Sequence, residues 1–96
     1  MRIALDYDNT YALDKPFWDQ FIKQAHEAGH HVICITLRFP SAPIDDMPCR
    51  VFYTSHQAKK PFAASQNIAV DIWIDDTPEL ITDESYGPMS NFAHLP

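Results

Sequence analysis

The sequence contains little glycine, little cysteine and few basic residues. Its two glycines exclude a glycine-rich phosphate loop of the P-loop or dinucleotide-binding type, because such a loop needs several. Its two cysteines, Cys34 and Cys49, lack the close spacing of a zinc site and are too few for a disulfide framework. We therefore expect the protein in a reducing compartment, the cytoplasm.

Acidic residues outnumber basic ones, thirteen against seven, which gives a net charge of −6. This balance argues against non-specific binding to long nucleic acid and to anionic membrane surfaces, both of which attract basic proteins. No apolar run approaches the roughly 20 residues of a membrane span. Residues 1–6 enter a strand pattern at once, without the layout of a signal peptide. We expect neither a membrane nor a long nucleic acid as partner.

The 96 residues, 46% of them hydrophobic, suit one small globular domain, residues 1–96. Strands are expected at residues 2–6, 31–36, 50–54 and 68–75, helices at 14–29 and 57–66, and one more helical turn at 78–82. Gly29 and Asn67 tolerate positive φ and are expected to end the two helices. The three prolines in 37–49 predict a loop, and residues 83–96, which show no period, predict an extended or frayed tail. This order predicts an α/β fold, a three-layer sandwich around a small parallel sheet.

Charged and hydroxyl side chains follow the expected strands and open the second helix. In a parallel sheet the carboxyl ends of all strands meet at one edge, where ligands bind. Two neighbouring carboxylates repel each other unless a cation or a shared proton lies between them. Paired lysines at a helix start oppose the helix dipole unless an anion is near. The candidates are Asp6, Asp8, Thr36, Lys59, Lys60, Asp75 and Asp76.

Each of these residues also has an ordinary structural interpretation. Aspartate and asparagine are common where a strand passes into a turn. Asp76 or Thr77 could cap a short helix that starts at Pro78, and Thr36 could satisfy local backbone groups at a strand end. The two lysines could form a solvated pair. The order of the residues along the chain, rather than any one of them, favours a functional site.

That order resembles the motifs of the haloacid-dehalogenase superfamily of phosphotransferases. The first motif, Asp-x-Asp-x-Thr, corresponds to residues 6–10, and the second, a hydroxyl residue ending the next strand, to Thr36. The third, a lysine opening a helix, corresponds to Lys59 or Lys60, and the fourth to the acidic pair 75–76. The match covers nearly the whole chain and is nearest to short, capless, bacteriophage-type hydrolase-like proteins. It implies a Rossmann-like core with strand order 3-2-1-4 and, for a viral protein, the host cytoplasm.

The resemblance implies a Mg²⁺-dependent phosphatase that acts on a phosphomonoester such as a nucleotide. Asp6 would attack phosphorus and form an aspartyl-phosphate. Asp8 would protonate the leaving oxygen and then activate water. The metal would bind the Asp6 carboxylate, the Asp8 main-chain carbonyl and Asp76, with Asp75 orienting the lysine or a metal-bound water.

The resemblance also implies where the phosphoryl group and the substrate bind. The residues assigned to this role are Asp6, Thr10, Thr36, Leu37, Arg38, Lys59 and Lys60. Arg38 could reach a second phosphate of the substrate, although a surface arginine on a loop is the more common role. Asn9 stands where the family commonly has glycine, a mild departure because asparagine tolerates unusual backbone angles.

Segments 9–13 and 36–50 are too short to hold a cap domain, so the site is expected to be open. An open site controls the attacking water poorly, which favours a second reading: a non-catalytic protein that binds and sequesters a phosphorylated nucleotide. A receiver domain also uses a Mg²⁺-bound aspartate, but its phosphorylated Asp usually follows the third strand, where residues 53–55 read Tyr-Thr-Ser. Exposed sheet edges favour self-association, and a second copy could supply a lid.

Overall fold

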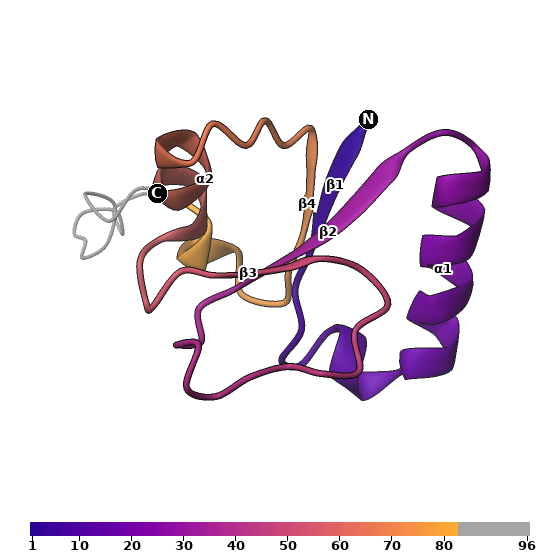
Figure 1. Ribbon diagram of the computed structural model, residues 1–96, viewed down its shortest axis with the longest axis horizontal. Helices are drawn as coiled ribbons and strands as arrows, with labels where there is room; N and C mark the ends of the chain where they lie inside the picture. The colour runs from indigo at the N-terminus through magenta and orange to yellow at the C-terminus, as the bar shows by residue number, and fades with distance from the viewer. Residues whose placement is uncertain (83–96) are drawn as a thin grey trace.

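The computed structural model describes residues 1–82, which form a small α/β fold with four strands and two α-helices (Figure 1). The elements are β1 (Arg2–Leu5), η1 (Tyr11–Leu13), α1 (Lys15–Glu27), β2 (His31–Thr36), β3 (Val51–Tyr53), α2 (Lys59–Ser65), β4 (Ile72–Ile74) and η2 (Pro78–Leu80). The expected tail, 83–96, lies outside the described residues. Within the described part, no helix is long and apolar enough to span a bilayer.

The four strands form one parallel sheet in the order β3-β2-β1-β4, as expected. In the centre, Leu5 of β1 lies opposite Cys34 of β2 and Ile74 of β4. One residue past the end of β1, Asp6 N donates to the Ile74 carbonyl (3.0 Å), so the backbone pairing continues beyond the strand. The carboxyl ends of β1 and β4 are therefore side by side, which places the residues that follow them at one edge.

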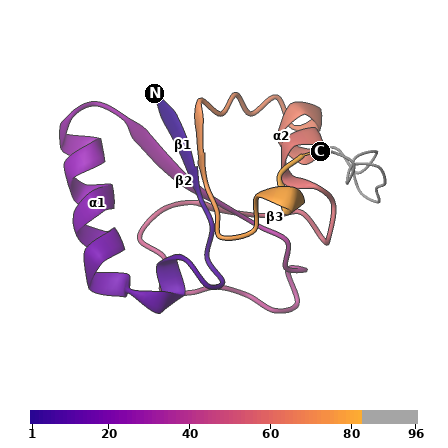
Figure 2. The ribbon, with the colours of Figure 1, turned by 180° about the vertical axis from the view of Figure 1, so that it is seen from behind.

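The two helices cover opposite faces of the sheet, so the predicted three layers are present (Figures 1 and 2). Alternate residues of the central strands face opposite helices, because successive side chains of a strand point to opposite sides. Ile3, Leu5 and Val32 pack with Ile22 and Ala25 of α1. On the other face, Ala4, Ile33 and Ile35 pack with Ala63 of α2. The core thus holds β1 and β2 firmly and fixes the direction in which both strands end.

The element boundaries differ from the expectations mainly at the sheet edges. The strands expected at 50–54 and 68–75 are shorter, Val51–Tyr53 and Ile72–Ile74, because each pairs with a neighbour on one side only. The turn expected at 78–82 is a 3-10 turn, Pro78–Leu80. Asn9, Gly29 and Asn67 have φ of 62°, 90° and 58°, as their residue types predicted.

Candidate metal and phosphate site

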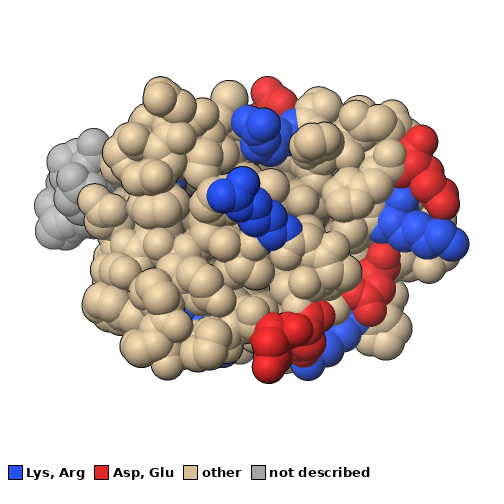
Figure 3. All heavy atoms as spheres, in the orientation of Figure 1, with Lys and Arg blue, Asp and Glu red and all other residues tan. Residues whose placement is uncertain are grey.

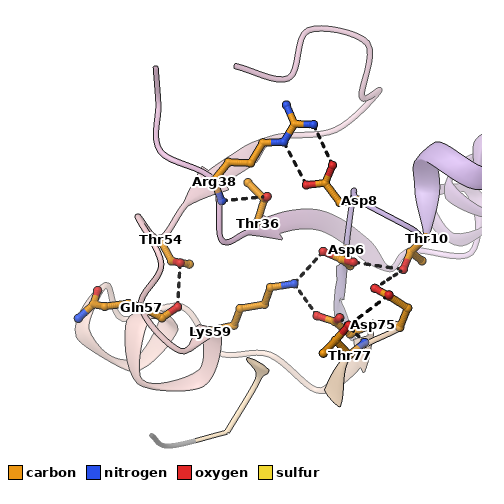
Figure 4. Close-up of polar contacts among 11 residues, drawn as sticks. Asp6, Asp8, Thr10, Thr36, Arg38, Thr54, Gln57, Lys59, Asp75 and Thr77 are labelled. Atoms are coloured by element: carbon orange, nitrogen blue, oxygen red, sulfur yellow. Dashed lines mark hydrogen bonds and ion pairs between the residues drawn. The ribbon is translucent and has the colours of Figure 1, made fainter. Parts of the chain in front are cut away.

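The predicted candidates other than Lys60 converge at the carboxyl edge of the sheet (Figure 4). Asp6 follows β1, Thr36 ends β2, Lys59 opens α2, and Asp75 and Asp76 follow β4. A small cavity of about 120 Å³ opens there. Its lining consists of Asp6, Asp8, Asn9, Thr36, Leu37, Lys59, Asp75, Asp76, Thr77 and Leu80. Four segments far apart in the sequence therefore contribute to one site.

Lys59 is the buried cation of this site. Its side chain is 2% exposed, and Nζ donates to Asp6 Oδ1 at 2.8 Å and to Asp75 Oδ2 at 2.5 Å. Burial lowers the pKa of Lys59, but its hydrogen bonds to the two carboxylates outweigh burial and raise the pKa overall. Lys59 is therefore charged and fixed in position, and its ammonium lies between the end of β1 and the end of β4.

Asp6 is buried beside this ammonium, and its pKa is higher than that of an ordinary aspartate. Burial raises its pKa to about 6, against the lowering effect of Lys59, and the nearby Asp76 and Asp75 raise it further. Thr10 Oγ1 lies 3.2 Å from Asp6 Oδ2 and 3.4 Å from Asp76 Oδ1, so its single proton can serve only one carboxylate at a time. Lys59 therefore holds one oxygen of Asp6, and Thr10 holds the other whenever its proton is not on Asp76.

The carboxylates of Asp6, Asp75 and Asp76 could together hold a metal ion. One oxygen of each lies within 4.8 Å of the others. Three carboxylates beside the single ammonium of Lys59 leave two negative charges without a partner when all are ionised. Hard carboxylate oxygens with this surplus charge fit a divalent cation such as Mg²⁺ or Ca²⁺. Asp75 uses one oxygen on Lys59 Nζ and the other on Thr77 N, whereas Asp6 and Asp76 each keep an oxygen that contacts only a hydroxyl group. Asp6 and Asp76 are therefore the freer pair of ligands.

Asp8 is turned away from the acidic cluster and pairs with Arg38. Arg38 Nε donates to Asp8 Oδ2 at 3.0 Å, and Nη2 donates to Asp8 Oδ1 at 2.8 Å (Figure 4). The Arg38 hydrogen bonds hold the pKa of Asp8 below its ordinary value. This pair lies at the rim, with the two side chains 31% and 52% exposed. The sequence places both residues near the site but does not predict their contact.

The turn after β3 positions the residues that follow β2. Thr54 N donates to the Thr36 carbonyl, Ser55 N to the Arg38 carbonyl and His56 N to the Leu37 carbonyl. Ser55 and His56 have φ of 55° and 70°, a backbone region that costs free energy for residues other than glycine. Backbone strain of this kind persists where the surrounding structure imposes it, often at a functional site.

The structure separates the two lysines that the sequence left as alternatives. Lys60, also a candidate for catalysis and substrate binding, is exposed and does not line the cavity. Its backbone N donates to the Ile81 carbonyl and anchors the segment after η2. Consecutive residues of a helix point about 100° apart, so only one of the pair can enter the site.

Thr77 is a site residue that the sequence reasoning assigned only to capping. Its N–H donates to Asp75 Oδ1 at 2.9 Å, and its hydroxyl donates to Asp76 Oδ2 at 3.1 Å. The first contact is an aspartate turn, in which the side chain bonds the backbone two residues on. The sequence Asp-Asp-Thr-Pro at residues 75–78 is the signal from which this turn could have been predicted. Thr77 thereby orients the carboxylates of Asp75 and Asp76.

A second, larger groove of about 800 Å³ lies at the opposite edge, around the amino ends of β2 and β3. Arg2, Arg50 and three histidines are among its lining residues, and no Asp or Glu is. On the face shown in Figure 3, acidic side chains lie along the margins and basic ones lie both near the middle and beside the acidic ones at the margins, without a large area of one sign. The cluster of Asp6, Asp75 and Asp76 lies away from this groove, at the carboxyl edge of the sheet.

Comparisons of the chain with models of protein families, with curated proteins and with solved structures found no match. Function therefore has to be argued from the geometry of the site.

Proposed function

We propose that the protein is a Mg²⁺-dependent phosphohydrolase of the haloacid-dehalogenase type that acts on phosphomonoesters through an aspartyl-phosphate. The observation that carries the proposal is the buried Asp6–Lys59–Asp75 arrangement beside Asp76 and Thr36, around one small cavity. A purely structural role would not require a charged lysine buried between the carboxylates of Asp6 and Asp75, because burying charges is costly.

In the proposed reaction Asp6 is the nucleophile. One of its carboxylate oxygens attacks phosphorus, the bond from phosphorus to the leaving oxygen breaks, and Asp8 gives that oxygen a proton. Asp8 then takes a proton from water, the water oxygen attacks phosphorus, and the bond to Asp6 breaks. The products are the alcohol, inorganic phosphate and a regenerated carboxylate. Lys59 and the Thr36 hydroxyl stabilise the negative charge of the transferring phosphoryl group.

The metal of this proposal would be held by Asp6 and Asp76, with Asp75 bonded to Lys59 and to Thr77 N. When bound, Mg²⁺ supplies positive charge that offsets the two carboxylates and the phosphoryl oxygens. Thr10 and Thr77 orient Asp76 through their hydroxyl groups.

Phosphate release from a panel of phosphomonoesters, with Mg²⁺ and with a chelator, tests the proposal. We expect Mg²⁺-dependent release by the wild type and none by Asp6→Asn, because an amide is not a competent nucleophile. Asp8→Asn should slow turnover by about 10²–10⁴, the usual effect of losing a general acid or base. Asp45→Asn, an exposed aspartate that does not line the cavity, is the control and should keep full activity. Wild-type rates in Asp6→Asn would rule out the mechanism.

A non-catalytic role, sequestering a phosphorylated nucleotide, is the second candidate. The observation that favours it is the engagement of both Asp8 oxygens by Arg38, which leaves the proposed acid occupied. A binder would return its ligand intact after denaturation, and Asp8→Asn would change affinity alone. Tight binding for hours with Mg²⁺ present and no phosphate released would support this role instead.

A further inference from the structure

Arg38 uses its whole guanidinium group at the rim of the site. Two of its nitrogens bind the two oxygens of Asp8, and the third, Nη1, donates to the Ala42 carbonyl at 3.1 Å. This bidentate geometry is also the one by which arginine binds phosphate and free carboxylate groups. The Nε and Nη2 atoms of Arg38 thus form an anion-binding fork, and Asp8 occupies this fork.

The backbone of Arg38 is fixed while its side chain keeps access to solvent. Its N–H donates to Thr36 Oγ1 at 3.2 Å, and its carbonyl accepts from Ser55 N at 3.2 Å. The guanidinium lies over the Tyr7 ring, with 5.1 Å from Cζ to the ring centroid. Since both partners of the ion pair are partly exposed, water competes for them and the pair contributes little stability. The fork can therefore change partner without movement of the main chain.

The charges at the site indicate what kind of substrate group Arg38 could bind. Among the described residues, Lys59 and Arg38 are the cations paired with carboxylates that line the cavity. Lys59 is committed to Asp6 and Asp75, next to the proposed position of the transferring phosphoryl group. Arg38 is left to balance any further negative charge that a substrate brings to the rim.

We propose that Arg38 determines specificity by exchanging Asp8 for a second anionic group of the substrate, an inference that rests on the proposed phosphatase function. The substrates are then phosphomonoesters that carry another phosphate or a carboxylate, such as bisphosphates. The exchange frees an Asp8 oxygen to face the leaving oxygen. With a simple monophosphate Arg38 stays on Asp8, and turnover is slow even when the ester binds.

The test compares matched substrates in wild type and in Arg38→Gln. Adenosine bisphosphate is paired with adenosine monophosphate, fructose bisphosphate with fructose monophosphate, and phosphoglycolate with ethylene glycol phosphate. We expect the wild type to prefer the doubly anionic member of at least one pair by about ten- to a hundredfold in kcat/KM, as for the gain or loss of charge-assisted hydrogen bonds. In Arg38→Gln the preference should fall to about threefold or less, because the doubly anionic substrate loses more kcat/KM than the monophosphate does.

Two further variants sharpen this comparison. Arg38→Lys keeps the charge but not the fork, so it should restore only part of the preference. Arg50→Gln removes an exposed arginine that lines the groove at the opposite edge, and should leave the preference unchanged. Equal kcat/KM values within every pair would overturn the proposal. So would an equal loss on both members in Arg38→Gln, which would mean that Arg38 only supports Asp8.

Binding to the Asp6→Asn variant separates this inference from the proposed function. Calorimetry with Mg²⁺ and the same pairs reports the discrimination without turnover. If the wild type hydrolyses none of the compounds, the phosphatase assignment fails. The specificity role of Arg38 then survives only if Asp6→Asn binds a doubly anionic compound about tenfold more tightly than its partner and loses that difference on adding Arg38→Gln. Equal affinities in Asp6→Asn would overturn it.

Discussion

Two adjacent lysines at the start of α2 have opposite surroundings. Lys59 is buried between Asp6 and Asp75, whereas Lys60 is exposed. Lys59→Met leaves buried carboxylates without their cation and should lower the free energy of unfolding by about 3–5 kcal/mol in metal-free protein. Lys60→Met should change it by about 0.5 kcal/mol or less. Urea denaturation of both variants checks this, and equal stabilities would contradict the assigned role of Lys59.

The raised pKa of Asp6 makes stability depend on pH in a defined direction. Its value is about 6 in the fold and 3.8 ordinarily, so between these values the folded state binds more protons than the unfolded state. The contribution of Asp6 to stability is therefore present at low pH and is lost as the pH rises from about 4 through about 6. The pKa values of Asp8, Asp46 and Asp76 are lowered, so the titration of these groups changes stability at pH values below this window.

We expect metal-free Asp6→Asn to lack this fall in stability and to be more stable than wild type at neutral pH. Denaturation with a chelator, across that pH range, measures it. Asp45→Asn should retain the wild-type profile. An unchanged profile in Asp6→Asn would mean that Asp6 is not the group responsible.

The five residues between β3 and α2, 54–58, contain a turn whose backbone N–H groups bond the residues that follow β2. Its strained residue His56 bonds the Leu37 carbonyl and packs on the Phe39 ring, 4.9 Å between ring centroids. His56→Gly and His56→Val both lose the ring contact, but only glycine takes positive φ without cost. The glycine variant should be the more stable by about 1–2 kcal/mol. Thermal unfolding compares them, and equal midpoints would show that the turn does not impose this backbone angle.

For the molecule as a whole, the surplus negative charge at one edge predicts stabilisation by divalent cations. A cation bound only by the folded state stabilises it by mass action, by about 2.7 kcal/mol at 100 times Kd. For a domain of this size, each kcal/mol of added stability raises the Tm by roughly 4–8 °C. We expect saturating Mg²⁺ to raise the Tm of wild type and of Asp45→Asn, and to have little effect on Asp76→Asn. Identical Tm values across a wide Mg²⁺ titration would argue against the metal site.

The sequence by itself determined the order of the elements, the parallel sheet and the edge at which the polar residues gather. These follow from local properties: buried β-branched runs, a proline-rich loop, and residues that tolerate positive φ at Asn9, Gly29 and Asn67. Such preferences act between neighbours in the chain. The topology of a parallel sheet then brings the ends of all strands to the same side.

Only the tertiary structure decided which charges meet. It brings Lys59 to Asp6 across 53 positions and Arg38 to Asp8 across 30, and it leaves Lys60 outside. It also shortens β4 and gives Thr77 its two aspartate contacts. No local pattern contains these outcomes, because a salt bridge depends on the packing of α2 against the sheet and on the path of the loops that carry each partner.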